Sequence, residues 1–266
     1  MKITPGSRAL VTGGASGLGL ALVSQLHSKG VRVLATDIAD ERPDSLAELP
    51  EVEYRRLNVT SDADWETARD WVTETWGGLD LLFNNAGVAA GGRIELTEID
   101  QWQWIVDINL LGVARGCRTF TPMMKEAGRG HIVNTASAAG LVHPPRMTEY
   151  VATKAGVVAL SESLYYELQP FGVEVSVVCP TFFKTNLTSS LRGKDEASQK
   201  MAAKLIDRSK VTADEIAQAV LRKVEKGTHL ITTDRNGQVA YAAKRWLRPL
   251  YRRQMIAAAV KMARRD

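Results

Sequence analysis

The stretch LVTGGASGLGLAL, residues 10–22, runs from an apolar segment through a glycine-rich turn into a helical pattern. A turn of this kind between a strand and a helix lets the backbone approach a phosphate group, and the helix start offers unpaired N–H groups and a favourable dipole. The glycine spacing differs from the G-x-G-x-x-G dinucleotide fingerprint, so a plain tight turn is the alternative. The rest of the chain has to distinguish the two.

Seven short, nearly continuous apolar runs alternate with longer helical patterns along the chain. This alternation is typical of a parallel sheet with helices on both faces, because strands buried on both sides are apolar throughout. The runs lie at residues 8–13, 31–37, 52–59, 79–87, 130–137, 173–180 and 228–233. We therefore predict a single doubly wound α/β domain with a central, mostly parallel seven-stranded sheet.

Capping residues predict where three of the helices begin or end. Ser61 with Asp64, and Thr212 with Glu215, have the spacing of side chains that cap a helix N-terminus. Gly30 follows the first helical pattern, at a position where a left-handed residue often ends a helix.

The composition is that of an ordinary globular protein, with 266 residues, of which 45% are hydrophobic and 24% charged. Cys117 and Cys179 have no metal-binding or redox spacing, so we expect two buried free thiols, a reducing compartment and no metal site. The N-terminus has no signal-peptide pattern, and no apolar stretch is long enough to span a membrane. These features predict a soluble, cytoplasmic protein.

An acidic residue stands at the end of the second apolar run, 18 residues after Gly19. Asp37 is placed to accept hydrogen bonds from the ribose hydroxyls of an adenosine, and it would repel a 2′-phosphate. No arginine immediately follows it, and Ser16 occupies the loop where a phosphate-binding base could stand. This context argues against a plain turn and favours NAD over NADP.

Five motifs occur in a fixed order along roughly the first four-fifths of the chain. They are TGGASGLG at 12–19, NNAG at 84–87, Asn109 in DINLLG, Ser137 in NTASAAG and YVATK at 150–154. Together they resemble the short-chain dehydrogenase/reductase family, in which the serine also precedes the tyrosine by 13 residues. The resemblance implies a Rossmann-type domain and an oxidoreductase acting on CH–OH groups.

The resemblance implies a catalytic tetrad of Asn109, Ser137, Tyr150 and Lys154. Oxidation of an alcohol needs a base, and the pKa of a free tyrosine, about 10, is too high for one at neutral pH. We expect Lys154, one helical turn away, and the positive nicotinamide to lower the pKa of Tyr150. By resemblance, Lys154 also binds the nicotinamide ribose, Ser137 holds the substrate oxygen and Asn109 holds a relay water. Taken singly, Ser137 could instead be a strand-end cap, Asn109 a helix-kink residue and Lys154 a surface charge.

The resemblance also implies which residues line the cofactor site, with Asn84 and Ala86 on the adenine-ribose side. Asn58 stands where the family usually has an aspartate facing the adenine amine, and its amide oxygen could accept the same bond. Thr181 stands where the family usually has glycine, and a β-branched residue restricts that loop. Thr185 matches the family residue that contacts the carboxamide group of the nicotinamide. The predicted set is Gly13, Ser16, Gly17, Leu18, Gly19, Asp37, Asn58, Val59, Asn85, Ala86, Gly87, Tyr150, Lys154, Pro180 and Thr185.

We predict a dinucleotide-binding catalytic domain over residues 1–238, in which a segment around 181–210 matches the family's substrate lid. Phe182 and Phe183 suggest an apolar pocket wall, and FFKT looks like the lid start of retinol and steroid dehydrogenases, although hinge packing is the alternative. We therefore expect a lipophilic secondary alcohol or ketone as the substrate. The alternatives are an NADPH-dependent ketoreductase and a non-catalytic NAD-binding sensor or scaffold.

Residues 239–266 form a basic amphipathic C-terminal extension. The extension contains eight basic residues and a single acidic one, Asp266, so its net charge is +7, which leaves −3 for the rest of the chain. Pro249 predicts a helix on each side of it. Peripheral contact with a membrane and a packing helix with a solvated basic face remain equal alternatives, and no motif supports nucleic-acid binding. The family resemblance suggests a homotetramer or homodimer packed through the helices of Asn109 and Tyr150.

Overall fold

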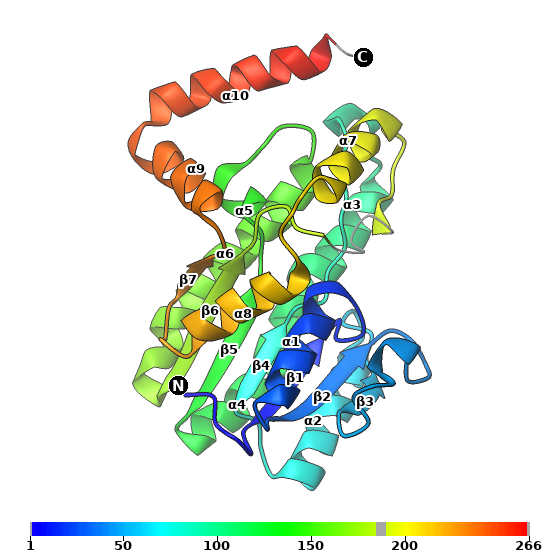
Figure 1. Ribbon diagram of the computed structural model, residues 1–266, viewed down its shortest axis with the longest axis vertical. Coiled ribbons are helices and arrows are strands. Elements are labelled where there is room, and N and C mark those ends of the chain that lie inside the picture. Colours follow the sequence, from blue (N-terminus) through cyan, green and yellow to red (C-terminus); the bar gives the residue numbers. More distant parts are fainter. Residues whose placement is uncertain (1, 185–189, 265–266) are drawn as a thin grey trace.

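Seven strands form one sheet, in the order β3-β2-β1-β4-β5-β6-β7 (Figure 1). The computed structural model describes residues 2–184 and 190–264. The strands are β1 (Arg8–Thr12), β2 (Arg32–Asp37), β3 (Glu53–Arg56), β4 (Leu81–Asn84), β5 (Gly130–Thr135), β6 (Val173–Cys179) and β7 (Leu230–Thr232). Every neighbouring pair is parallel, so the predicted doubly wound fold is confirmed and the sheet is parallel throughout.

Helices cover both faces of the sheet (Figure 1). On one face, α1 (Gly17–Ser28) and α8 (Ala213–Val224) pack against the strands through buried leucines and valines. On the other face lie α2 (Asp62–Trp76), α4 (Gly112–Ala127) and α6 (Thr148–Leu168). The near-continuous apolar strands have the composition that burial between two helical layers requires.

Short elements connect these layers. They are the 3-10 turns Asp44–Leu46, Ile94–Leu96 and Gln169–Phe171, α3 (Ile99–Val106), a π-helical turn (Asp107–Leu111), α5 (Ala139–Val142) and α7 (Glu196–Asp207). The described part of the chain contains no helix with the length and hydropathy needed to cross a bilayer. Cys117 and Cys179 are free and buried, as predicted.

The predicted helix caps are present. The Ser61 hydroxyl accepts a hydrogen bond from the Asp64 N–H at the start of α2. Thr212 and Glu215 form a reciprocal capping box at the start of α8. Gly30 follows α1 with a φ of +74°, a conformation that glycine adopts without a steric cost.

A buried polar chain fixes the layers beneath the predicted catalytic residues. Asn84 donates to Asn134 Oδ1 at 2.9 Å, and Asn134 donates to the Ser161 hydroxyl at 3.0 Å, which joins β4 and β5 to α6. Gly116 of α4 lies so close that a Cβ there would stand 2.2 Å from Asn84 Oδ1. The expectation that Asn84 lines the adenine-ribose side is therefore wrong, because its side chain is buried toward Asn134.

Two helices, α9 (Arg235–Trp246) and α10 (Arg248–Ala263), follow the last strand, as predicted, but the break between them falls at Leu247, and Pro249 lies in the first turn of α10. Helix α9 begins before Val239, so it crosses the position at which the sequence places the start of the extension. Lys244 Nζ donates to the Leu141 carbonyl at 2.6 Å, and the Tyr251 hydroxyl donates to the Val142 carbonyl. The extension is thus attached to α5.

Candidate active site

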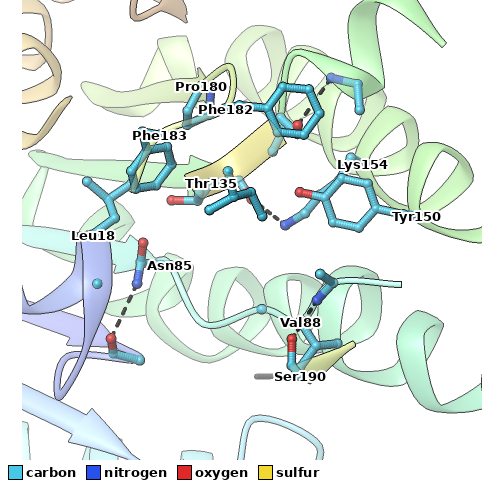
Figure 2. A pocket seen from close by; sticks show the side chains of 18 of the residues that line it. Leu18, Asn85, Val88, Thr135, Tyr150, Lys154, Pro180, Phe182, Phe183 and Ser190 are labelled. Atoms are coloured by element: carbon cyan, nitrogen blue, oxygen red, sulfur yellow. Dashed lines mark hydrogen bonds between the residues drawn. The ribbon is translucent and has the colours of Figure 1, made fainter. Parts of the chain in front are cut away.

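A cavity of about 920 Å³ lies at the carboxyl ends of the central strands, where parallel α/β folds bind their ligands (Figure 2). It brings together most of the residues that the sequence singled out. Those on its wall are Gly13, Ser16, Gly17, Leu18, Asp37, Asn58, Val59, Asn85, Ala86, Gly87, Ser137, Tyr150, Lys154 and Pro180. Gly19 and Asn109 lie behind the wall, and Thr185 falls outside the described residues.

The glycine turn between β1 and α1 has the conformation that a phosphate-binding loop needs. Gly13 and Gly17 have φ values of +63° and +51°. Ser16 stands at the N-cap of α1 without a side-chain capping bond, so its hydroxyl does not compete for the helix N–H groups there. Gly19 packs against the turn, and a Cβ at its position would lie 1.9 Å from the Gly13 carbonyl oxygen.

We expect Gly19→Ala to weaken NADH binding about 100-fold. The added methyl group must displace the Gly13 carbonyl, and this shifts N–H groups whose hydrogen bonds to an anion contribute about 1.5–3 kcal/mol each. Titration of NADH followed by fluorescence measures the change. Gly91→Ala is the control, because the nearest atom to its Cβ is 3.4 Å away. Unchanged affinity in Gly19→Ala would contradict the assignment of this turn.

The glycine turn is tied to the loop after β4. The Thr12 hydroxyl accepts hydrogen bonds from the N–H groups of Asn85 and Ala86, both at 3.0 Å. Asn85 Nδ2 donates to the Thr12 carbonyl at 3.0 Å. Two walls of the cavity are therefore held at a fixed separation by residues of the TGGASGLG and NNAG motifs.

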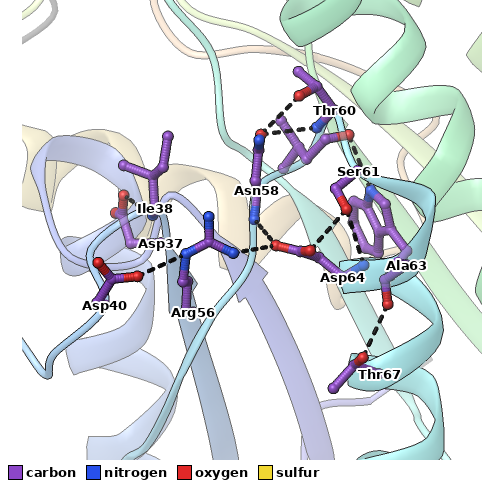
Figure 3. Close-up of polar contacts among 12 residues, drawn as sticks. Asp37, Ile38, Asp40, Arg56, Asn58, Thr60, Ser61, Ala63, Asp64 and Thr67 are labelled. Carbon is purple, nitrogen blue, oxygen red and sulfur yellow. Dashed lines mark hydrogen bonds and ion pairs between the residues drawn. The ribbon is translucent and has the colours of Figure 1, made fainter.

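Asp37 ends β2 and lines the cavity, and Figure 3 shows its contacts. Its oxygens accept hydrogen bonds from the Ala15 and Ile38 N–H groups, at 3.1 and 2.8 Å, which fix the carboxylate beside the glycine turn. Arg56 is its neighbour on β3, but that guanidinium pairs with Asp64 at 2.7 Å and with Asp40 at 2.9 Å. The nearby arginine is therefore already engaged by two carboxylates.

Asn58 also reaches the cavity, with a side-chain arrangement that the sequence did not predict (Figure 3). Its Oδ1 accepts hydrogen bonds from the Thr60 N–H and hydroxyl, at 3.1 and 2.9 Å. The oxygen that was expected to face the adenine amine is thus engaged within its own turn.

Tyr150, Lys154 and Ser137 all line the cavity, and Figure 2 shows the tyrosine and the lysine beside each other. Tyr150 and Lys154 come from adjacent turns of α6, and Ser137 follows β5. Burial raises the pKa of the Tyr150 phenol above its ordinary value, and a hydrogen bond with Ser137 offsets only part of the rise. This rise reflects the protein alone, whereas the lowering expected from the sequence also includes the positive charge of the oxidised nicotinamide.

Lys154 is buried, with 4% of its surface exposed, and burial lowers the pKa of its ammonium to about 8. Its Nζ donates to the Thr135 carbonyl at 2.9 Å and lies 5.8 Å from the centre of the Tyr150 ring. A Cβ on Gly87 would stand 3.3 Å from this Nζ, so the glycine leaves the ammonium open toward the cavity. Lys154 is therefore not a surface charge, which was the alternative role.

Asn109 is fully buried on the π-helical turn between α3 and α4. Its Oδ1 accepts from the Val88 N–H at 2.8 Å, and its Nδ2 donates to the Val88 carbonyl at 2.9 Å. Both polar atoms therefore hold the chain that follows Gly87, beside Lys154. Asn109 supports this wall from behind.

The described parts of the predicted lid are fastened to the domain. Asp195 caps α7 and accepts hydrogen bonds from the backbone N–H and the Nε of Arg93, both at 3.0 Å. Burial alone would raise the pKa of Asp195, but these bonds and the capping bond from Ser198 lower it to about 2. The Ser190 hydroxyl accepts from the Ala89 N–H at 2.9 Å. The lid thereby forms one side of the cavity.

Thr181, which replaces the family's glycine, has a partner in α9. Its hydroxyl donates to Asp234, the residue that caps α9 by accepting from the Gly237 N–H at 2.9 Å. The loop after β6 is thus linked to the start of the C-terminal helices.

Sequence reasoning missed one wall of the cavity, which is formed by α5 and α9. Val142, Pro144 and Met147 line it from the segment around α5, and Asn236 and Ala240 line it from α9. No motif marks these residues. The only sequence signal is the apolar and small character of the segment before Tyr150.

A glycine turn at a helix start, an acid at the end of β2, a half-buried tyrosine and a buried lysine share one cavity, as expected of an oxidoreductase that uses a nicotinamide cofactor. The family model for short chain dehydrogenases matches residues 7–196. The chain belongs to this family, whose members bind nicotinamide cofactors and act on CH–OH groups.

Relatives and solved structures agree with that assignment. The chain is 41% identical to a 3-alpha-(or 20-beta)-hydroxysteroid dehydrogenase of Mycobacterium bovis over 69% of this chain and 71% of the relative. It is 36% identical to the mitochondrial D-beta-hydroxybutyrate dehydrogenase of Rattus norvegicus over 67% of this chain and 54% of that relative. A Burkholderia phymatum short-chain dehydrogenase/reductase in complex with NAD superimposes with a TM-score of 0.86 at 30% identity, covering 92% of this chain and 95% of that one.

Proposed function

We propose that this protein is an NAD-dependent dehydrogenase that interconverts a lipophilic secondary alcohol and its ketone, with Tyr150 as the general acid and base. The observation that carries the proposal is a single cavity with Asp37 toward one end and Tyr150 with Ser137 at the other. Phe182, Phe183 and the apolar segment around α5 supply its walls. The similarity to a hydroxysteroid dehydrogenase supports a lipophilic substrate.

The residues present fit a nicotinamide dinucleotide. The start of α1 would hold the pyrophosphate, Asp37 the adenosine ribose and Lys154 the nicotinamide ribose. Glycine suits positions 13 and 87, because a Cβ there would stand 3.0 Å from Ala86 Cα or 3.1 Å from Asn109 Oδ1, closer than ordinary van der Waals contact. When bound, the nicotinamide accepts the hydride that leaves the alcohol carbon.

Tyr150 and Ser137 handle the proton. Ser137 holds the substrate oxygen, and the Tyr150 phenolate takes the hydroxyl proton during oxidation and returns it to the ketone oxygen during reduction. Because the pKa of the phenol is raised, Tyr150 is protonated and ready to donate in the reductive direction. In the oxidative direction, the positive charges of Lys154 and of the oxidised nicotinamide stabilise the phenolate.

Asp37 underlies the proposed preference for NAD. A carboxylate there accepts from ribose hydroxyls and repels a 2′-phosphate. The neighbouring Arg56 is already paired with Asp40 and Asp64 instead of being turned toward such a phosphate. We expect Asp37→Ser to shift the ratio of NADH to NADPH affinity about 10- to 100-fold toward NADPH, as the loss of a charged hydrogen-bond partner predicts. Matched titrations of the two cofactors measure the ratio.

Glu41→Ser is the control for this substitution, because it removes an exposed acid from the same region outside the cavity wall. It should leave the ratio unchanged. A wild-type protein that binds NADPH more tightly than NADH would overturn the cofactor proposal and favour an NADPH-dependent ketoreductase.

The reaction is tested by NADH formation over a panel of secondary alcohols, from short hydroxy acids to long-chain and steroid alcohols. We expect turnover with the lipophilic members. Turnover confined to short hydroxy acids would contradict the proposed substrate class. If NAD binds and no member of the panel is oxidised, the proposal of an enzyme gives way to that of a cofactor-binding sensor.

A further inference from the structure

The charged side chains of the C-terminal helices are all positive. Residues 235–264, which form α9 and α10, contain eight basic residues and no acidic residue. Because the whole chain carries +4 and the charges of Arg265 and Asp266 cancel, the first 234 residues carry −4. The basic character of the protein is therefore concentrated on this one element.

Helix α10 presents two apolar stripes instead of one. Its inner stripe is Tyr251, Met255, Ala258 and Met262, at the spacing of one helix face, and Tyr251 is buried against α5. The outer stripe contains Ile256 and Val260, four residues apart, of which 65% and 45% are exposed. A helix that packed only against its own domain would need the inner stripe alone.

Arginines border the outer stripe. Arg252, Ile256, Val260 and Arg264 follow one another at intervals of four residues, so they lie in one row along the helix, and Arg253 lies beside that row. The row is apolar in its middle and cationic at its ends. Helices that lie flat in the headgroup region of a bilayer have apolar side chains with basic side chains beside them.

The corner between α9 and α10 is also apolar and exposed. Trp246 is 75% exposed, and Leu247 and Leu250 are each more than half exposed. The Arg245 guanidinium lies over the Trp246 ring, 5.4 Å from its centre. Tryptophan is enriched where a protein meets the membrane–water interface. Helix α10 lies across the end of the molecule beyond the sheet, where a flat surface can reach it (Figure 1).

A groove lies between this element and the active-site cavity. It has a volume of about 620 Å³ and lies between α5, α9 and α10. Most of its lining is apolar, from residues such as Val142, Val239, Ala243 and Met255. It shares Val142, Pro144, Asn236 and Ala240 with the catalytic cavity.

We propose that α9 and α10 dock this protein on an anionic membrane surface, with Trp246, Leu250, Ile256 and Val260 in the headgroup layer and the neighbouring arginines on lipid phosphates. The groove then opens beside the bilayer, so that a lipophilic molecule reaches the cavity along an apolar path. Two copies of this element would repel each other face to face, because each carries +8. A nucleic acid would use the arginines and leave the tryptophan, leucine and isoleucine exposed to water.

Co-flotation of the full-length protein with vesicles tests the docking without any reference to catalysis. One set of vesicles is phosphatidylcholine alone, and the other is an equal mixture of phosphatidylcholine and phosphatidylglycerol. We expect binding to the mixed vesicles, at least about tenfold weaker binding to the neutral ones, and release at high salt, because each basic residue near an anionic surface contributes to the attraction.

Two double variants separate the two components. Arg252→Gln with Arg253→Gln and, separately, Ile256→Ser with Val260→Ser should each reduce binding to the mixed vesicles about tenfold or more. The matched control for the first is Arg222→Gln with Lys226→Gln, two exposed basic residues near the end of α8. The control for the second is Ile94→Ser with Ile99→Ser, which removes two exposed isoleucines elsewhere. Both controls should bind as the wild type does.

Light scattering and the affinity for NADH are measured on the same proteins. We expect all of them to keep the wild-type mass and NADH affinity. Wild-type binding that is equal on both vesicle types, or that survives both double variants, would overturn the proposal. A lower mass in the Ile256→Ser, Val260→Ser variant would instead assign the stripe to contact between subunits, and retention of the wild type by DNA but not by vesicles would assign it to nucleic acid.

Discussion

Tyr150→Phe is expected to reduce kcat about 1000-fold while leaving the affinity for NADH within about threefold of the wild-type value. The substitution removes one oxygen atom and keeps the ring that packs on α6 beside Lys154. A positioned acid or base contributes typically 10²- to 10⁴-fold to a rate, and the Tyr150 hydroxyl is the one that is hydrogen-bonded with Ser137 in the cavity. Steady-state kinetics in both directions and a cofactor titration measure the two quantities.

Tyr166→Phe is the matched control, since it removes the same atom from the same helix at an exposed position. It should behave as the wild type does. A Tyr150→Phe protein that kept more than a tenth of the wild-type kcat would exclude Tyr150 as the general acid and base, whatever its place in the cavity.

The sheet and the cofactor loops were predictable because each rests on a local pattern. Strand, glycine turn and helix follow one another within residues 10–22, and the caps at Ser61 and Thr212 depend on residues three positions apart. Parallel strands then bring their carboxyl ends to one edge. Once the order of the strands is known, Asp37 and Ser137 have to lie along the same cavity.

The misassignments arose where the direction of a side chain decides its role. Asn84 and Asn85 are neighbours, and alternation along β4 turns the first into the buried chain with Asn134 and the second toward the glycine turn. The amide oxygen of Asn58 is engaged by Thr60, a local turn contact that competes with a ligand. A sequence motif names these residues without showing which way they face.

The pKa of Tyr150 and the role of α9 depend on tertiary packing, which no short pattern encodes. Proximity to Lys154 follows from helical spacing, but the depth of burial that raises the pKa of the phenol follows from the whole cavity. Thr181 looked like a disturbance of the loop after β6. Its partner, Asp234, lies 53 residues later, and their contact makes α9 part of the cavity wall.

Lys154→Met is expected to reduce kcat by about 100- to 1000-fold and, at neutral pH, to stabilise the fold. Burial lowers the pKa of Lys154 from 10.5 to about 8, and a shift of this size corresponds to a cost of about 3 kcal/mol for holding the charge in the native state. Methionine fills a similar volume without a charge. The variant avoids this cost of about 3 kcal/mol but loses the hydrogen bond to the Thr135 carbonyl, which contributes about 1 kcal/mol. The free energy of unfolding should therefore rise by about 2 kcal/mol.

The pH dependence of this difference has a definite sign. Below pH 8, Lys154 is charged in both the folded and unfolded states, so the wild type bears the full cost of burying the charge. Between pH 8 and 10.5 the unfolded state binds more protons than the folded one, and the wild type gains stability relative to the variant as the pH rises. Denaturant unfolding of both proteins across this range should show the gap closing.

Lys223→Met provides the contrast, because Lys223 also donates to a backbone carbonyl, that of Thr232 at 2.7 Å, but is only half-buried on α8. Its replacement should lower the free energy of unfolding throughout. A Lys154→Met protein that is less stable than the wild type at neutral pH would show that the ammonium is not held at a cost. The expected result, an inactive protein with a more stable fold, would identify Lys154 as a residue whose burial destabilises the native state and serves the chemistry at Tyr150.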